Sequence, residues 1–268
     1  MNRDAFKNKQ NPLLRTFFIP FGLFILLSIT PALHCVADDF PMPFQPGEKM
    51  VFELKWTVVS AGEASLEVKS FKKVNNEDAY HFMLTAKSNR FLDRIYKVRD
   101  RIEGYTDMDI TRSLFYSKRQ REGKTKLNAV VKFDWENSTA QYTEYIKSSK
   151  RKPIELMPGT FDPLSIFYYS RRLPLKVGEE MQRPVSDGKK CVMGKVKVVR
   201  REKITVPAGE FDTFLIVPEL QHVGGVFKKS KNATIEIWIS ADNRRLPVKL
   251  KSEVVVGSFT GELISYKQ

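Results

Sequence analysis

Apolar and polar residues alternate with a period of two along most of the chain after residue 48. Successive side chains of a β-strand point to opposite faces of a sheet, so this alternation predicts strands with one buried face. The clearest run extends from Lys49 to Val58. We expect its apolar side chains to lie together on one buried face, namely Met50, Phe52, Leu54, Trp56 and Val58.

Further alternating runs follow at short intervals. Turn-forming pairs such as Asn75-Asn76, Asp187-Gly188 and Asp242-Asn243 separate them. Many short strands between such turns are typical of an all-β domain. Because each run has one polar face, antiparallel pairing is favoured. The sequence therefore predicts a mainly β protein, with a single antiparallel curved sheet or an incomplete barrel.

Two short motifs occur twice. Pro46-Gly47-Glu48 resembles Val177-Gly178-Glu179, and the segment 59–63 (VSAGE) resembles the segment 206–210 (VPAGE). The spacing between the motifs differs in the two halves of the chain. The chain could therefore consist of two similar β halves instead of one sheet without internal repetition, and this alternative stays open.

One segment, residues 163–172, breaks the alternation and predicts a short helix. Asp162 is a good N-cap, because its carboxylate can accept hydrogen bonds from the amides of the first turn. Pro163 suits the first helical position. Leu164, Phe167 and Tyr168 would then share one face. This helix could cover an open end of the sheet, which is the simpler reading, or it could gate a cavity inside it.

The first 37 residues have the layout of a secretory signal peptide. A basic segment containing Arg3 and Arg15 precedes an apolar stretch at residues 17–29, and small residues lead to Ala37. That stretch is shorter than the roughly 20 apolar residues of a membrane-spanning helix. We therefore expect cleavage after Ala37, a single mature β domain of residues 38–268, and a periplasmic location.

Cys35 leaves lipoprotein anchoring open as a second possibility. An acylated cysteine usually follows a small residue, whereas His34 precedes this one, so plain cleavage is favoured. After cleavage at Ala37 the only cysteine left is Cys191. The mature chain would then contain no intramolecular disulfide.

Basic residues outnumber acidic ones throughout. The whole chain has a formal charge of +14, of which the expected leader supplies +3, so the mature part would carry +11. Such a charge attracts anionic partners, which in an envelope are lipids or acidic glycans. We expect an envelope lipid or anionic glycan as ligand, with peripheral membrane contact as a further possibility. Nucleic acid is not expected as a partner, because export separates the protein from it. The oligomeric state stays open.

Catalytic and metal-binding motifs do not stand out. Neither His81 nor His222 has metal-ligand spacing to another histidine or cysteine. Carboxylates cluster between Asp93 and Asp109, and a glycosidase needs two such groups for catalysis. Arginines lie beside them in the sequence, so cross-strand ion pairs would explain the cluster without catalysis. We therefore expect no cofactor, no metal and no catalytic residue, and an enzymatic role is not favoured.

Lysine and arginine are densest between Lys87 and Lys126, and aromatic residues make up 12% of the chain. Basic side chains would attract an anionic headgroup, and tryptophans in strands could line an apolar cavity. A solvated face and an ordinary core would explain the same residues. The predicted ligand-binding residues are Arg94, Arg99, Arg101, Arg119, Arg121, Trp56 and Trp238.

Several short motifs, taken in their order, resemble the bacterial domain-of-unknown-function family 3108 over about residues 44–263. They include Pro46-Gly47-Glu48, Arg99-Asp100-Arg101, Phe161-Asp162-Pro163, the segment 206–211 and the segment 244–249. This resemblance implies an exported Gram-negative protein, and it supplies no catalytic residues. The segment around Trp238 is also similar to a hairpin of periplasmic lipoprotein carriers, which are curved half-barrels.

Three functional hypotheses follow. The first is a non-catalytic envelope protein that binds or carries an amphipathic, anionic ligand such as a lipid or lipid-linked glycan. The second is a structural or assembly factor without a small ligand. The third, and least favoured, is a hydrolase that uses the carboxylates between Asp93 and Asp109.

Overall fold

The structure is a computed structural model that describes residues 42–219, 234–253 and 258–268. The chain divides into two compact units, Met1–Asp39 and Phe40–Gln268. The expected leader, its cleavage after Ala37, and Cys35 lie outside the described residues and remain predictions. Within the described ranges, no helix has both the length and the apolar character needed to cross a bilayer.

Strands dominate the second unit. The first eight are β1 (Lys49–Trp56), β2 (Val59–Val74), β3 (Glu77–Ser88), β4 (Arg99–Thr106), β5 (Ser113–Glu122), β6 (Thr125–Asp134), β7 (Thr139–Glu144) and β8 (Ser149–Lys150). The others are β9 (Ile154–Glu155), β10 (Glu180–Ser186), β11 (Cys191–Val206), β12 (Gly209–Pro218), β13 (Thr234–Ser240), β14 (Pro247–Glu253) and β15 (Ser258–Lys267). Two short helices join them, a 3₁₀ helix η1 (Leu92–Arg94) and an α-helix α1 (Ser165–Ser170).

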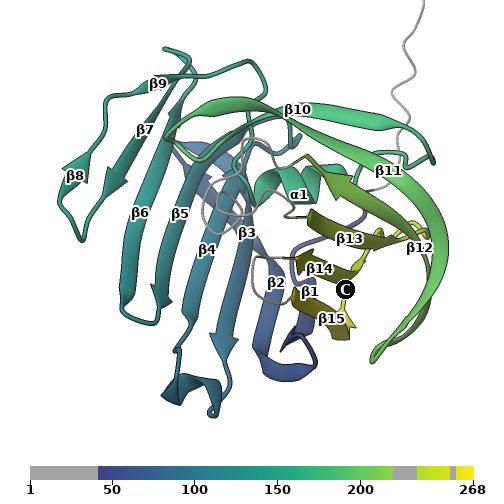
Figure 1. The fold of residues 1–268 in the computed structure, drawn as a ribbon. Coiled ribbons are helices and arrows are strands. Elements are labelled where there is room, and N and C mark those ends of the chain that lie inside the picture. The colour runs from purple at the N-terminus through teal and green to yellow at the C-terminus, as the bar shows by residue number, and fades with distance from the viewer. Residues whose placement is uncertain (1–41, 220–233, 254–257) are drawn as a thin grey trace, which may run out of the picture. The chain divides into compact units, whose positions relative to one another are not determined.

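All these strands belong to one open antiparallel sheet, as the alternation predicts. Its order is β10-β11-β12-β13-β14-β15-β1-β2-β3-β4-β5-β6-β7-β8, and β9 pairs with β7. The sheet curves, and α1 lies against one of its faces (Figure 1). We call this the helix face. It carries Phe82 and Tyr116, which belong to the main apolar core.

The first strand is shorter than the sequence pattern suggests. Met50 and Phe52 are buried as expected, but Leu54 is only half-buried and Trp56 and Val58 are exposed. The reason is local: β1 ends at Trp56, and Thr57 has a positive φ of 56° that turns the chain into β2. The expectation of one buried face through Val58 is therefore wrong at its far end.

The repeated Gly-Glu motif adopts the same local structure in both halves. The amide of Gly47 donates to the carbonyl of Val68 at 2.8 Å, and that of Gly178 donates to Val198 at 2.9 Å. In return, the Val68 amide donates to Glu48 and the Val198 amide to Glu179, each at 2.9 Å. Both glycines have positive φ, 101° and 91°, which only glycine adopts without strain. Hairpins β1–β2 and β10–β11 thus begin in the same way.

Helix α1 confirms the predicted break in the alternation, although it is shorter than 163–172. The buried carboxylate of Asp162 accepts hydrogen bonds from the amides of Leu164 and Ser165, both at 2.9 Å, as expected of an N-cap. Tyr168 is fully buried and stacks on Phe82, with ring centroids 4.0 Å apart. The helix therefore packs into the core.

Candidate functional site

A lysine interrupts the apolar helix face in the middle of β5. Lys118 lies opposite Ile102 of β4 and Ala129 of β6, and it follows Tyr116 on the same face. All three neighbours pack in or against the main core. A charged side chain at such a position must be paired or must serve another purpose, because burying an ammonium group carries a high free-energy cost.

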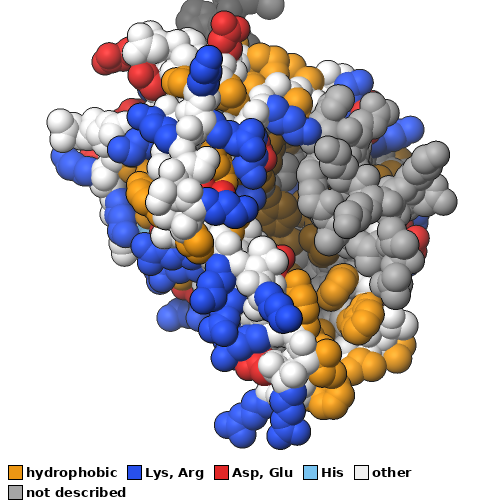
Figure 2. Space-filling view, turned by 60° about the vertical axis from the view of Figure 1, so that its left-hand side comes forward, with side chains coloured by type: hydrophobic (Ala, Val, Ile, Leu, Met, Phe, Trp, Pro, Cys, Tyr) orange, Lys and Arg blue, Asp and Glu red, His pale blue; other side chains and the backbone are white. Residues whose placement is uncertain are grey.

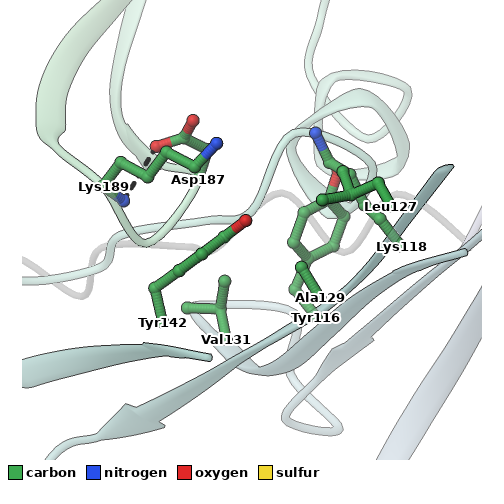
Figure 3. A pocket seen from close by; sticks show the side chains of 8 residues that line it. All are labelled: Tyr116, Lys118, Leu127, Ala129, Val131, Tyr142, Asp187 and Lys189. Carbon is green, nitrogen blue, oxygen red and sulfur yellow. Dashed lines mark hydrogen bonds between the residues drawn. The ribbon is translucent and has the colours of Figure 1, made fainter. Parts of the chain in front are cut away.

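The Lys118 side chain borders a small pocket between the sheet and the turn that joins β10 to β11. Its lining residues are Tyr116, Lys118, Leu127, Ala129, Val131, Tyr142, Asp187 and Lys189. Figure 3 shows side chains from the sheet on one side and from the turn on the other, facing the same space. The pocket has a volume of about 10 Å³, which is room for roughly one water-sized group.

Gly188 allows the turn to approach the sheet so closely. It has a positive φ of 79°, and a Cβ atom added to it would lie 2.6 Å from Cγ2 of Val131. Any larger residue would therefore be strained in its backbone and would collide with β6. The glycine fixes Asp187 and Lys189 beside Tyr142, whose ring lies 4.9 Å from the Lys189 ammonium.

The polar groups of this pocket are incompletely satisfied. No ion pair joins Lys118 to any carboxylate in the described ranges, and its ammonium lies 5.5 Å from the centre of the Tyr116 ring. Burial lowers the pKa of Lys118, with a further decrease from Lys189 and an opposing increase from Asp187. The hydroxyl of Tyr142 is buried and lacks a hydrogen-bond partner among the described residues.

The phenols of the pocket remain neutral hydrogen-bond donors. Burial raises the pKa of Tyr142, and it raises the pKa of Tyr116 well above the ordinary value. A bound anion would offset the desolvation of Lys118 and accept a hydrogen bond from Tyr142. This arrangement suits recognition of a single anionic oxygen.

An apolar strip runs across the helix face next to Lys118. It consists of partly buried side chains from neighbouring strands, namely Ala64, Leu84, Ile102 and Leu127. In the space-filling view, hydrophobic side chains line a hollow while lysine and arginine side chains crowd its left-hand margin (Figure 2). An unpaired cation next to an apolar strip matches the two ends of an amphipathic molecule.

A larger cleft of about 490 Å³ lies at Trp238, lined by residues of β11, β13, β14 and β15. Each of its cations, Arg200, Lys249 and Lys251, pairs with a carboxylate. Glu202 pairs with Arg200 at 2.9 Å and accepts a hydrogen bond from the Trp238 indole at 2.8 Å, and Lys249 pairs with Glu262 at 2.8 Å. Trp238 is buried, as expected of a core residue. This cleft is therefore a weaker candidate than the pocket beside Lys118.

The structure places three of the predicted arginines on the face opposite α1. Arg101 and Arg119 are cross-strand neighbours, and Arg121 is two residues farther along β5. Arg101 pairs with Glu103. These side chains form an exposed basic surface that does not include the pocket beside Lys118, and their role in ligand binding remains a prediction.

The other predicted residues lie at one end of the strands. Arg94 is exposed in η1, and Arg99 pairs with Asp93 at 2.6 Å. Trp56 ends β1 and stacks on Phe259, with ring centroids 6.4 Å apart. The structure thus separates Trp56 from Trp238, which lies in the cleft described above, and their predicted binding role is untested.

Three of the five carboxylates between Asp93 and Asp109 pair with arginines, Asp93 among them. Glu103 pairs with Arg101, and Asp107 lies 3.7 Å from Arg112. His81 is buried, stacks on Tyr105 and lies 3.7 Å from Glu103. Over the described ranges, no group of three His, Cys, Asp or Glu residues is arranged to hold a metal ion.

Sequence reasoning passed over Lys118, Tyr142 and Lys189. A signal for Lys118 exists, since Leu114, Tyr116 and Lys118 occupy alternate positions of one strand and a lysine stands where the pattern requires an apolar residue. Tyr142 and Lys189 carry no such signal, because only the docking of the β10–β11 turn on the sheet brings them together.

Comparison with known proteins gives a family but no activity. The family model described as "Protein of unknown function (DUF3108)" matches residues 51–264. No curated protein matches the chain. A solved β-barrel-like protein of the domain-of-unknown-function family DUF1849 from Brucella abortus has a TM-score of 0.51 and 10% identity, over 82% of this chain and 96% of that one. This similarity shows a shared fold.

Two further solved structures are more distant. One, from Bacteroides fragilis, is provisionally described as an exported protein with a YmcC-like fold; its TM-score is 0.34 at 9% identity, over 85% of this chain and 99% of that one. The other, from Parabacteroides distasonis, is provisionally described as a lipoprotein; its TM-score is 0.30 at 13% identity, over 85% of this chain and 97% of that one.

Proposed function

Because the chain belongs to the DUF3108 family, whose description assigns no activity, we propose a function from the site beside Lys118. The protein is a non-catalytic envelope protein that binds an amphipathic molecule with an anionic headgroup. The observation that carries this proposal is an ammonium group on the apolar face of a sheet, without a carboxylate partner in the described ranges.

The geometry suggests how the headgroup would bind. The pocket holds about one water-sized group, so a single phosphate or carboxylate oxygen would enter it rather than a whole headgroup. Lys118 would supply the charge, and the unpaired hydroxyl of Tyr142 would donate a hydrogen bond. Lys189, which is exposed on the turn above, would face the rest of the headgroup.

The apolar part of the ligand would follow the strip of partly buried side chains. Leu84 and Ile102 lie opposite each other on β3 and β4, and Ile102 lies opposite Lys118. An alkyl chain placed there would remove apolar surface from water on both sides. The headgroup and the chain would therefore contact adjacent parts of one surface.

The two alternative functions receive less support. A carboxylate-dependent hydrolase needs a general acid or nucleophile that is free to react. Asp93 and Glu103 are each engaged by an arginine, and Asp100 accepts hydrogen bonds from the Gln120 side chain and the Arg121 amide. A purely structural factor would need Lys118 only for its contact with the Tyr116 ring and its attraction to Asp187. Ligand binding explains that lysine directly.

Mass spectrometry of the purified protein tests the proposal. The protein should be isolated without detergent and then extracted with organic solvent, so that any bound amphiphile is identified by mass. We expect an anionic amphiphile in the extract, depleted in a Lys118→Met preparation. An extract without any amphiphile, together with no uptake of added dodecyl phosphate, would leave the structural-factor hypothesis ahead.

A further inference from the structure

Three turns of the sheet meet along one edge, which we call the apolar edge and define as residues 56–60, 89–97, 123–124 and 258–259. It includes the β1–β2 turn, the segment containing η1, and the β5–β6 turn, at the lower margin of the view in Figure 1. This edge stands apart from the pocket beside Lys118, and the inference below does not depend on the proposed function.

Hydrogen bonds hold these turns together. The amide of Asn89 donates to the carbonyl of Ala61 at 2.9 Å, and its side chain donates to the carbonyl of Ser60 at 2.6 Å. The amide of Gly123 donates to Lys97 at 2.9 Å, which joins the β5–β6 turn to the same segment. The edge is therefore one continuous surface, not a set of independent loops.

This edge exposes large apolar side chains. Val58, Ile95 and Phe91 are 84%, 72% and 62% exposed, the highest values among the large hydrophobic residues of the described ranges. Tyr96 is also exposed, as is the stacked pair of Trp56 and Phe259. An exposed apolar cluster of this kind marks a surface that contacts a partner, because leaving it in water is unfavourable.

Cations alternate with the apolar residues. The segment 90–97 reads RFLDRIYK, so Arg90, Arg94 and Lys97 flank the exposed aromatic and aliphatic side chains. Neither these three nor Lys124 of the β5–β6 turn forms an ion pair with a carboxylate of the described ranges. The one acidic residue of the segment, Asp93, is bound by Arg99 at 2.6 Å. The edge therefore presents cations that form no direct ion pair beside exposed apolar groups, although Asp93 lies near Lys97 and two further carboxylates, Asp100 and Glu122, lie near Tyr96.

We propose that the apolar edge docks on the surface of an anionic phospholipid bilayer. Aromatic and aliphatic side chains would enter the boundary between headgroups and acyl chains, and the cations would contact the phosphates, as in peripheral membrane proteins. The surface favours a bilayer over a protein partner because its apolar side chains project singly from separate turns and are interleaved with cations. Such a pattern matches a layer of anionic headgroups above hydrocarbon.

Vesicle co-sedimentation tests this proposal with the chain as it is recovered from expressing cells. The probe is a vesicle of phosphatidylglycerol and phosphatidylethanolamine, compared with one of phosphatidylcholine. We expect binding to the anionic vesicle to fall about 30-fold in Arg90→Gln/Arg94→Gln, since each cation near such a surface contributes roughly 1 kcal/mol. Lys73→Gln/Lys132→Gln removes the same charge at the far ends of β2 and β6 and should have little effect.

The apolar contribution needs its own variants. Phe91→Ser/Ile95→Ser should weaken binding more than tenfold, because burying either side chain in the bilayer is worth at least about 1.5 kcal/mol. Met108→Ser/Val177→Ser, which changes exposed apolar residues away from the edge, is the matched control. All four residues are exposed, so both variants should fold normally.

Fluorescence quenching shows whether the apolar edge, and not another segment, contacts the lipid. Brominated acyl chains should quench part of the tryptophan fluorescence of the wild-type protein, and Trp56→Phe should abolish that part. Equal loss of binding in the edge variants and their controls would overturn the proposal. Wild-type protein that shows no quenching would do the same and would point to a protein partner for this edge.

Discussion

Arg171 and Glu48 form a fully buried ion pair in which the guanidinium donates to both carboxylate oxygens, at 2.6 and 2.8 Å. Arg171 also donates to the backbone carbonyls of Arg244 and Arg245, both at 2.9 Å. The pair therefore joins the end of α1 to the start of β1 and to the β13–β14 turn. Three segments far apart in the sequence depend on one guanidinium.

Breaking this pair should destabilise the protein strongly. We expect Glu48→Gln to lower the free energy of unfolding by about 3–5 kcal/mol, because it leaves a buried arginine without its counter-charge. Urea denaturation followed by fluorescence measures the change. Glu77→Gln, which breaks the exposed 3.6 Å contact with Arg112, should cost less than about 1 kcal/mol. Similar losses in both variants would contradict the role of burial.

His81 should make the stability depend on pH in the weakly acidic range. Burial lowers the pKa of His81 to about 4, from 6.5, although nearby Glu103 opposes the decrease. Between these two values the unfolded chain binds the proton more readily than the folded protein, so stability falls as the pH decreases from about 6.5 to about 4. The loss should approach roughly 3 kcal/mol.

His81→Phe tests this dependence, because phenylalanine can still stack on Tyr105. Denaturation midpoints of the variant should change less between pH 7 and pH 4.5 than those of the wild type. The partner carboxylate should be checked with Glu103→Gln, which removes the opposing interaction, lowers the pKa of His81 further and should extend its contribution to lower pH. An identical pH profile for His81→Phe and the wild type would rule out His81 as its source.

Gly188 should be intolerant of a side chain for two separable reasons. In Gly188→Ala, the positive φ should cost about 1 kcal/mol, and the collision with Val131 should add about 1–3 kcal/mol. Gly178 also has a positive φ, of 91°, but no atom lies within 4 Å of the place that a Cβ would take there. Gly178→Ala should therefore show only the first cost. Equal shifts in unfolding free energy would mean that the β10–β11 turn does not pack on β6 as described.

Asp162 contributes more than an ordinary cap. Besides the amides of α1, its carboxylate accepts a hydrogen bond from the Ser113 hydroxyl at 2.6 Å. We expect Asp162→Ala to cost about 1 kcal/mol for the cap. A further cost of about 1–3 kcal/mol arises because the proton of the buried Ser113 hydroxyl loses its acceptor, although the hydroxyl oxygen still accepts from the amide of residue 162. Asp134→Ala, which removes an exposed turn contact with Asn137, should have a smaller effect. Thermal unfolding of both variants decides the comparison.

The sequence predicts the class of fold because strands and helix starts are indicated by residues close together in the chain. Period-two alternation identifies the strands, and Asp162-Pro163 marks the only α-helix of the described ranges. The sequence does not predict the end of β1, because Thr57 turns the chain with a positive φ and a threonine gives no sign of such a turn. The Arg171–Glu48 pair is missed as well, since its partners are 123 residues apart in the chain.

The candidate site is harder to predict for the same reason. The high frequency of lysine and arginine between residues 87 and 126 led to the prediction that Arg101, Arg119 and Arg121 bind the ligand. All three are exposed, as is usual for charged side chains. Lys118 differs because its strand register places it on the helix face, and the pocket forms only when Gly188 brings a turn from the other half of the chain against β6. Such contacts depend on sheet curvature, which alternation does not specify.

Whether Lys118 recognises an anionic headgroup is best decided by the affinity of Lys118→Met for dodecyl phosphate, determined by titration calorimetry beside that for uncharged 1-dodecanol. Methionine keeps the apolar stem and removes the ammonium. We predict that dodecyl phosphate binds the variant at least tenfold more weakly than it binds the wild type, since a hydrogen bond to a charged group contributes about 1.5–3 kcal/mol. Affinity for 1-dodecanol should be unchanged, and Lys132→Met should behave like the wild type. Equal affinity of wild type and Lys118→Met for dodecyl phosphate would contradict the proposed role of Lys118.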